Sequence, residues 1–138
     1  MKTRYVDLIE QTFDFPKDEF KLDDDQLVWN DLPLVELLEK HGTPLRITYL
    51  PKIGEKIELA RNCFAKAFAT HNYSGSYEYF YCTKSNHFHY VIDKVLDKGV
   101  NLETSSAYDL EMIELLIERG RITKDSTILC NGFKDERY

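Results

Sequence analysis

Basic residues are not in excess in this 138-residue sequence, because 24 Asp and Glu outnumber 18 Lys and Arg. No basic face is evident, which argues against nucleic acid or an anionic membrane as the main partner. The start of the chain has no apolar stretch of the kind found in a signal peptide, and no run approaches membrane-spanning length. These absences predict a cytoplasmic protein that binds no membrane and no nucleic acid.

Cysteine is scarce, and the three cysteines, Cys63, Cys82 and Cys130, form no CxxC pair. Each lies in an apolar run, where a buried, reduced thiol is the usual occupant. Cys82, His87 and His89 are potential metal ligands, but the two histidines diverge on a helix and no second cluster completes four ligands. We therefore predict no metal site. Phosphate-loop, dinucleotide-binding and GxSxG motifs are also absent.

What the sequence does contain is an alternation of helix and strand patterns in its second half. Apolar residues at helical spacing predict helices within 53–68, 87–99 (with Phe88 on the apolar face) and 106–120. Short apolar runs predict strands within 77–83, 100–103 and 126–132. This alternation predicts a parallel sheet with right-handed crossovers.

The first part, through about Tyr49, is less regular. The segment 31–44 predicts a helix that Asp31 can cap and that Gly42 and Pro44 end, and 45–49 predicts a short strand. The preceding Asp run indicates a turn on a solvated edge.

Three predicted strands end at Lys84, Glu103 and Asn131, on one side of the sheet. In parallel α/β folds this carboxyl edge carries the chemistry. An exposed lysine at a strand end is the ordinary interpretation of Lys84. The alternative is a lysine that forms a Schiff base, because burial beside Phe80 and Cys82 would favour its neutral, nucleophilic form.

Two acidic residues accompany this lysine. Glu103 ends a buried strand and needs a partner, for which Lys84 on the neighbouring strand is the candidate. Asp109 is explained most simply as the partner of Ser106 in a capping box at the start of the helix that follows.

Three phrases carry a resemblance to a known family. The stretch from Tyr79 to Ile113, "YFYCTKSNHFHYVIDKVLDKGVNLETSSAYDLEMI", resembles the opening barrel segment of the pyridoxal-phosphate-dependent basic amino acid decarboxylases with the alanine-racemase type of fold. The phrase "ILCNGFKDERY" is similar to the biosynthetic arginine decarboxylases, and "LPLVELLEKHGTPLRITYLPKI" resembles the lead-in to their first barrel helix.

The resemblance implies an α/β fold: the first parallel βα units of a TIM-type (β/α) barrel, preceded by a segment of a C-terminal-type β-domain. Residues 1–50 would belong to that β-domain and 51–138 to the incomplete barrel. Lys84 would hold pyridoxal 5'-phosphate covalently, Glu103 would lie near the cofactor, and Ser106 and Asp109 would support the site.

The activity implied is decarboxylation of L-arginine to agmatine and CO2 in polyamine biosynthesis, by a full-length protein that is a homodimer or a higher homo-oligomer. The family's phosphate loop and the partner of its pyridine nitrogen would lie beyond this chain, so the chain alone is expected to be inactive. Decarboxylation of diaminopimelate, ornithine or lysine instead of arginine is a second interpretation of the resemblance, and a catalytically silent regulatory homologue is a third.

The chain departs from the family pattern at two points. It has Cys-Thr-Lys-Ser-Asn where the family more often has Pro-Ile-Lys-Val-Asn, and Phe133 stands where tyrosine is common. These differences leave the assignment of Lys84 unchanged and bear on the identity of the substrate.

Overall fold

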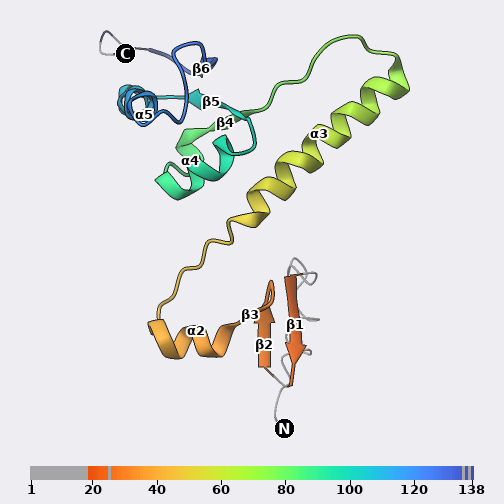
Figure 1. The fold of residues 1–138 in the computed structure, drawn as a ribbon, viewed down its shortest axis with the longest axis vertical. Coiled ribbons are helices and arrows are strands. Elements are labelled where there is room, and N and C mark those ends of the chain that lie inside the picture. Colours follow the sequence, from red (N-terminus) through yellow and green to blue (C-terminus); the bar gives the residue numbers. More distant parts are fainter. Residues whose placement is uncertain (1–18, 25, 135, 137) are drawn as a thin grey trace. The chain divides into compact units, whose positions relative to one another are not determined.

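The computed structural model describes residues 19–24, 26–134, 136 and 138. The chain divides into two compact units, one ending at Ile47 and one beginning at Thr48, and each is described by itself (Figure 1). Among the described residues, no helix is both long and apolar enough to cross a membrane.

The first unit contains a small antiparallel sheet of order β1-β2-β3, followed by one helix. Phe20 pairs with Trp29 and Lys21 with Val28. The expectation that this part of the chain is irregular is therefore wrong, because the residues before and after the expected turn pair as the two strands of a hairpin. The elements are β1 (Phe20–Asp23), β2 (Gln26–Trp29), β3 (Leu32–Pro33) and α2 (Leu34–His41).

Helix α2 forms where a helix was predicted, but Asp31 does not cap it. Pro33 occupies the N-cap position without a side-chain hydrogen bond, and Asp31 instead pairs with Lys21. Gly42, at a φ of 78°, ends the helix as expected and donates its N–H to the carbonyl of Leu38 at 2.7 Å. The strand predicted at 45–49 is wrong, because these residues pair with no strand among the described residues.

The second unit alternates helices and strands as predicted, with boundaries shifted by a few residues. Helix α3 is longer than expected, β4 and β6 are shorter because only three residues of each pair with a neighbour, and β5 has the expected length but begins one residue later. The elements are α3 (Pro51–His71), β4 (Phe80–Cys82), the 3₁₀ turn η2 (Thr83–Ser85), α4 (His89–Leu96), β5 (Asn101–Thr104), α5 (Ala107–Glu118) and β6 (Ile128–Cys130).

The three strands of this unit form a parallel sheet in the order β4-β5-β6, which confirms the predicted topology. Cys82 lies opposite Glu103, and Thr104 lies opposite Cys130. Because paired residues of parallel strands share a face, Cys82 and Glu103 lie on one face and Thr104 and Cys130 on the other. The α/β class is thereby established, whereas closure into a barrel stays a prediction.

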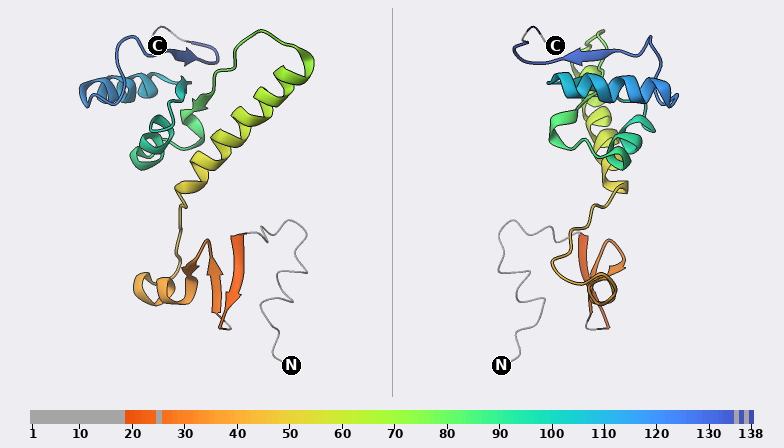
Figure 2. Two further views of the ribbon diagram at one scale, coloured as in Figure 1. Left: turned by 45° about the vertical axis from the view of Figure 1, so that its right-hand side comes forward. Right: turned by 90° about the vertical axis from the view of Figure 1, so that its left-hand side faces the viewer.

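The hydrophobic core of the unit lies on the face of the sheet that Leu102 occupies. Leu102 of β5 and Val95 of α4 are completely buried, and Ile57 of α3 and Ile113 of α5 join the same cluster. Helices α3, α4 and α5 therefore all pack around one strand-centred core (Figure 2). The placement of Phe88 on the core face of a helix was wrong, because it precedes the first turn of α4 and is 51% exposed.

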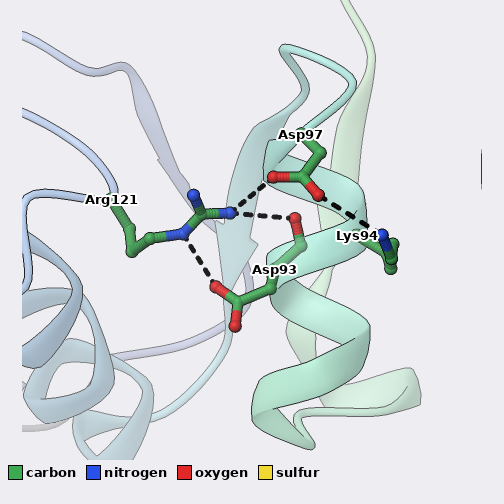
Figure 3. Close-up of polar contacts among 4 residues, drawn as sticks. All are labelled: Asp93, Lys94, Asp97 and Arg121. Atoms are coloured by element: carbon green, nitrogen blue, oxygen red, sulfur yellow. Dashed lines mark hydrogen bonds and ion pairs between the residues drawn. The ribbon is translucent and has the colours of Figure 1, made fainter.

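An exposed ion-pair network ties the segment after α5 to α4 (Figure 3). Arg121 Nε donates to Asp93 Oδ1 at 2.8 Å, and its Nη2 donates to Asp97 Oδ1 at 2.8 Å and to the backbone carbonyl of Asp93 at 3.1 Å. Lys94 Nζ lies 3.7 Å from the other oxygen of Asp97. The Arg121 guanidinium thus binds both side chains and a backbone carbonyl at the end of α4.

Candidate functional site

The carboxyl edge of the parallel sheet brings together the polar residues that follow β4, β5 and β6, as the sequence predicts. Two hydrogen bonds join the three strand ends: Thr83 Oγ1 donates to the carbonyl of Glu103 at 3.0 Å, and the N–H of Asn131 donates to the carbonyl of Thr104 at 2.8 Å. Thr83 and Thr104 are completely buried. The side chains at this edge therefore stand on a fixed backbone.

Lys84 lies at this edge, in the turn η2, but its side chain is exposed. The predicted burial beside Phe80 and Cys82 is wrong for this chain. The reason is the position of Lys84 in the chain. Cys82 is the last residue of β4 that pairs with β5, so Lys84 lies two residues beyond the end of the sheet. Within the described part of the chain, no carboxylate lies within 4 Å of the Lys84 amine.

Glu103 lies between the other two strand ends and is half-buried. Asn131 Nδ2 donates to Glu103 Oε1 at 2.7 Å. Hydrogen bonds from Asn131 and Cys82, together with the charge of Lys84, lower the pKa of Glu103 below its ordinary value, and they outweigh partial desolvation. The direct partner of Glu103 is thus Asn131 rather than Lys84, which acts on it only through its charge.

Ser106 and Asp109 form the predicted capping box at the start of α5. Asp109 Oδ2 accepts from the backbone N–H groups of Ser105 and Ser106 at 2.8 and 2.9 Å, and the N–H of Asp109 donates to Ser106 Oγ at 3.3 Å. Partial burial acts to raise the pKa of Asp109, but the hydrogen bonds from Ser105 and Ser106 outweigh it and the pKa is lowered. The structural interpretation of both residues is confirmed, and a supporting role at a cofactor stays a prediction.

A second polar group at this edge could not be found from the sequence. Thr104 Oγ1 donates to Cys130 Sγ at 3.8 Å and lies 2.7 Å from the hydroxyl of Tyr138. The Lys134 amine stands 4.0 Å from the centre of the Tyr138 ring. Hydrogen bonds from Tyr138 and Thr104 and the charge of Lys134 lower the pKa of the Cys130 thiol. The spacing of Cys130, Lys134 and Tyr138 matches no motif, so the sequence carries no signal that these residues lie close together.

All three cysteines are free, as predicted, but none is fully buried. Cys63 and Cys130 are exposed, and Cys82 is half-buried. The apolar runs around them therefore do not bury their thiols. Across the residues that the structure describes, no group of three or more His, Cys, Asp or Glu side chains is placed to hold a metal ion.

A concavity of about 400 Å³ lies beside the N-terminus of α5. It is lined by Ser105, Ser106, Tyr108 and Lys134, among others, so it offers hydroxyl groups, an aromatic ring and a cation. Its described lining includes neither Lys84 nor Glu103. The concavity is therefore separate from the strand-end residues Lys84 and Glu103.

Comparison with known proteins finds relatives that are named biosynthetic arginine decarboxylases. The chain is 34% identical over 122 residues to a protein named biosynthetic arginine decarboxylase 2 from Synechocystis sp.. It is 33% identical over 101 residues to a biosynthetic arginine decarboxylase from Nostoc sp. and 31% identical over 111 residues to one from Gloeobacter violaceus. These matches cover 78%, 70% and 76% of this chain, respectively.

The same matches cover only 18%, 14% and 17% of the relatives' own lengths. The chain thus spans less than a fifth of each of these proteins. No protein-family model matches the chain, and no solved structure matches it.

Proposed function

Because the chain is homologous to part of the proteins named biosynthetic arginine decarboxylase, we propose that it is part of a pyridoxal-phosphate-dependent decarboxylase and supplies the lysine that binds the cofactor. The reaction proposed is conversion of L-arginine to agmatine and CO2, as a step of polyamine biosynthesis. The observation that carries the proposal is the position of Lys84 at the carboxyl edge of a parallel sheet, next to Glu103 on the central strand.

The residues present fit such a cofactor in one respect that can be examined directly. A lysine attacks an aldehyde through its neutral amine, and an ion pair with a carboxylate would hold that amine in the charged form. No carboxylate lies within 4 Å of the Lys84 amine in the described structure, so no such ion pair holds it. The pyridine ring, when bound, supplies the electron sink for loss of CO2.

Each of the predicted site residues would then have a separate role. Lys84 would hold the cofactor covalently and be freed when the substrate amine takes its place. Glu103, whose pKa is lowered, would be ionised at neutral pH and present a negative charge beside the cationic amine. Ser106 and Asp109 would fix the start of α5 against this edge through their mutual hydrogen bonds.

We further propose that residues 1–50 contribute to the β-domain of the complete protein and 51–138 to its barrel. The first unit, an antiparallel hairpin with one helix, differs in kind from the parallel α/β unit, and this supports the division. The complete protein would assemble as a homodimer or a higher homo-oligomer, which sedimentation of that protein would test.

A catalytically silent relative is the second candidate, and the exposure of Lys84 favours it. A cofactor lysine works best when it is shielded from water, because desolvation favours the neutral amine. This alternative and the enzyme differ in whether Lys84 retains a covalently bound cofactor.

The test is reductive trapping. The chain is incubated with pyridoxal phosphate and borohydride, and the labelled lysines are mapped by mass spectrometry. We expect Lys84 to carry more label than Lys124, an exposed lysine in the loop before β6, and Lys84→Ala to abolish that excess. Equal labelling of both lysines would contradict the proposal. Release of CO2 from arginine, ornithine, lysine and diaminopimelate by the complete protein then identifies the substrate.

A further inference from the structure

We propose that Asn131 is a positioning residue, whose side-chain amide holds the Glu103 carboxylate at the centre of the carboxyl edge and directs its charge toward Lys84. The inference rests on the proposed function for what the edge does, and it adds a residue for which the family resemblance implies no role. It begins from the 2.7 Å hydrogen bond between Asn131 Nδ2 and Glu103 Oε1.

The backbone of Asn131 is held by hydrogen bonds at both of its polar groups. The backbone N–H donates to the carbonyl of Thr104 at 2.8 Å, which continues the ladder between β5 and β6 by one residue. The Lys134 amine donates to the Asn131 carbonyl from the other side. The fixed backbone gives the Asn131 side chain a constant point of origin, from which its amide reaches Glu103 Oε1.

Glu103 has polar neighbours on both flanking strands. Cys82, at the end of β4, lies opposite Glu103 in the sheet, and its thiol also acts to lower the pKa of the Glu103 carboxyl. Hydrogen bonds to the charged form favour ionisation, and the pKa of Glu103 is lowered by Asn131 first, by Cys82 second and by the charge of Lys84 last. The carboxylate is therefore hydrogen-bonded by Asn131 and kept charged, and the charge of Lys84 acts on it in the same direction.

A purely structural role explains less of this geometry. The strand ladder uses the backbone of Asn131, and any residue other than proline would supply that N–H. Among the described residues, the side-chain amide makes one hydrogen bond, the contact with Glu103. Removing the amide should therefore leave the sheet intact while it releases the carboxylate.

The sheet offers a matched control. Asn101, at the opposite end of β5, also donates its side-chain amide to a glutamate, Glu78, at 3.5 Å. Asn101→Ala thus removes the same chemical group from the same sheet at the edge where no cofactor is proposed.

The experiment follows the Glu103 carboxyl carbon by NMR as a function of pH in the 138-residue chain. In Asn131→Ala the titration midpoint of Glu103 should rise toward the ordinary value of a glutamate. In Asn131→Asp, which has nearly the same shape, it should rise further because two carboxylates would then adjoin. Asn101→Ala should leave it unchanged. An unchanged midpoint in both Asn131 variants overturns the proposal, and the isosteric variant keeps this readout available if the alanine variant does not fold.

The second readout is the rate at which pyridoxal phosphate and borohydride label Lys84. This rate should rise several-fold in Glu103→Gln and in Asn131→Ala, because a negative charge directed at Lys84 favours its protonated, unreactive form. The double variant should show little further gain, because both changes remove the same interaction. If Asn131→Ala shifts the Glu103 midpoint but leaves the labelling rate unchanged, the claim that Asn131 directs the Glu103 charge toward Lys84 is wrong. Absence of preferential Lys84 labelling in the unmodified chain would instead overturn the proposed function, while the Glu103 titration still decides the role of Asn131.

Discussion

Ser106 and Asp109 bind each other's backbone across the first turn of α5. The Ser106 hydroxyl accepts from the N–H of Asp109 at 3.3 Å, and the Asp109 carboxylate accepts from the N–H of Ser106 at 2.9 Å. Because α5 starts directly after the carboxyl end of β5, this reciprocal cap sets where the helix leaves the candidate site. Its stability is therefore tied to the geometry of that edge.

The cap makes the stability of the second unit depend on pH. The pKa of Asp109 is lowered in the folded state, so its contribution is fully present above the ordinary aspartate pKa, about 4, and is lost as the pH falls through the lower folded value. We expect Asp109→Asn to lower the free energy of unfolding at neutral pH by about 0.3–1 kcal/mol, with the deficit disappearing in acid. Urea denaturation at several pH values measures it. Glu114→Gln, an exposed change in the middle of α5, is the control, and a deficit that persists unchanged in acid would contradict this view.

Arg121 should stabilise the unit in a way that depends on salt. Its side chain joins Asp93 and Asp97 on α4, and all three groups are at least partly exposed, so the attraction is screened by ions (Figure 3). Arg121→Gln should lower the Tm by a few degrees at low ionic strength and by less in concentrated salt. Arg119→Gln, a nearby exposed arginine, should change the Tm little under either condition. Equal Tm values for Arg121→Gln and the unmodified chain at low salt would show that the network contributes nothing.

Cys130 should be the fastest of the three thiols to react with an alkylating agent at neutral pH. Thiolate is the reactive form, and hydrogen bonds from Tyr138 and Thr104 and the charge of Lys134 lower the pKa of Cys130. Limited treatment with iodoacetamide followed by peptide mapping gives the order of labelling. Tyr138→Phe removes one donor and should slow Cys130 several-fold while leaving Cys63, which is also exposed, unaffected. Faster labelling of Cys63 would refute the prediction.

The core should be sensitive at Leu102 and tolerant at Leu115. Leu102 of β5 is completely buried in the core beneath the helices, whereas Leu115 is 49% exposed on α5. Leu102→Ala should lower the free energy of unfolding by about 2–5 kcal/mol, through lost apolar burial and the cavity that remains. Leu115→Ala should change it by about 0.5 kcal/mol or less. Denaturant unfolding of both variants measures the contrast, and similar losses at the two sites would mean that the core lies elsewhere.

The regular half of the fold could be predicted from the sequence because its signals are local. Gly99 and Gly120 end α4 and α5 in left-handed backbone conformations, with φ of 60° and 66°, and the capping box of Ser106 and Asp109 marks a helix start within four residues. The hairpin of the first unit has no comparable signal, because an acidic run is equally typical of an irregular edge and only Phe20 and Leu22 alternate before it. The strand predicted at 45–49 failed because a strand requires a partner that its own residues do not specify.

The candidate site could be predicted only as a set of neighbours. Parallel topology places Lys84, Glu103 and Asn131 at one edge, and pattern alone establishes that topology. The burial of Lys84 could not be predicted, because it depends on chain segments distant in sequence that cover or fail to cover the strand ends. The hydrogen-bond partner of Glu103 could not be predicted either, because it depends on the exact side-chain positions at the strand ends. In the structure, Asn131 Nδ2 rather than Lys84 lies 2.7 Å from Glu103 Oε1.

Buried and half-buried residues alternate along β5, so one strand contributes both to the core and to the candidate site. Leu102 and Thr104 are completely buried, while Asn101 and Glu103 face the other way and are only half-buried. Slipping this strand by a single residue would drive an acid and an amide into the apolar interior and turn a leucine out to water. An insertion or deletion within these four positions should thus abolish folding rather than merely inactivate the site, so natural length variation is expected to collect in the loops on either side.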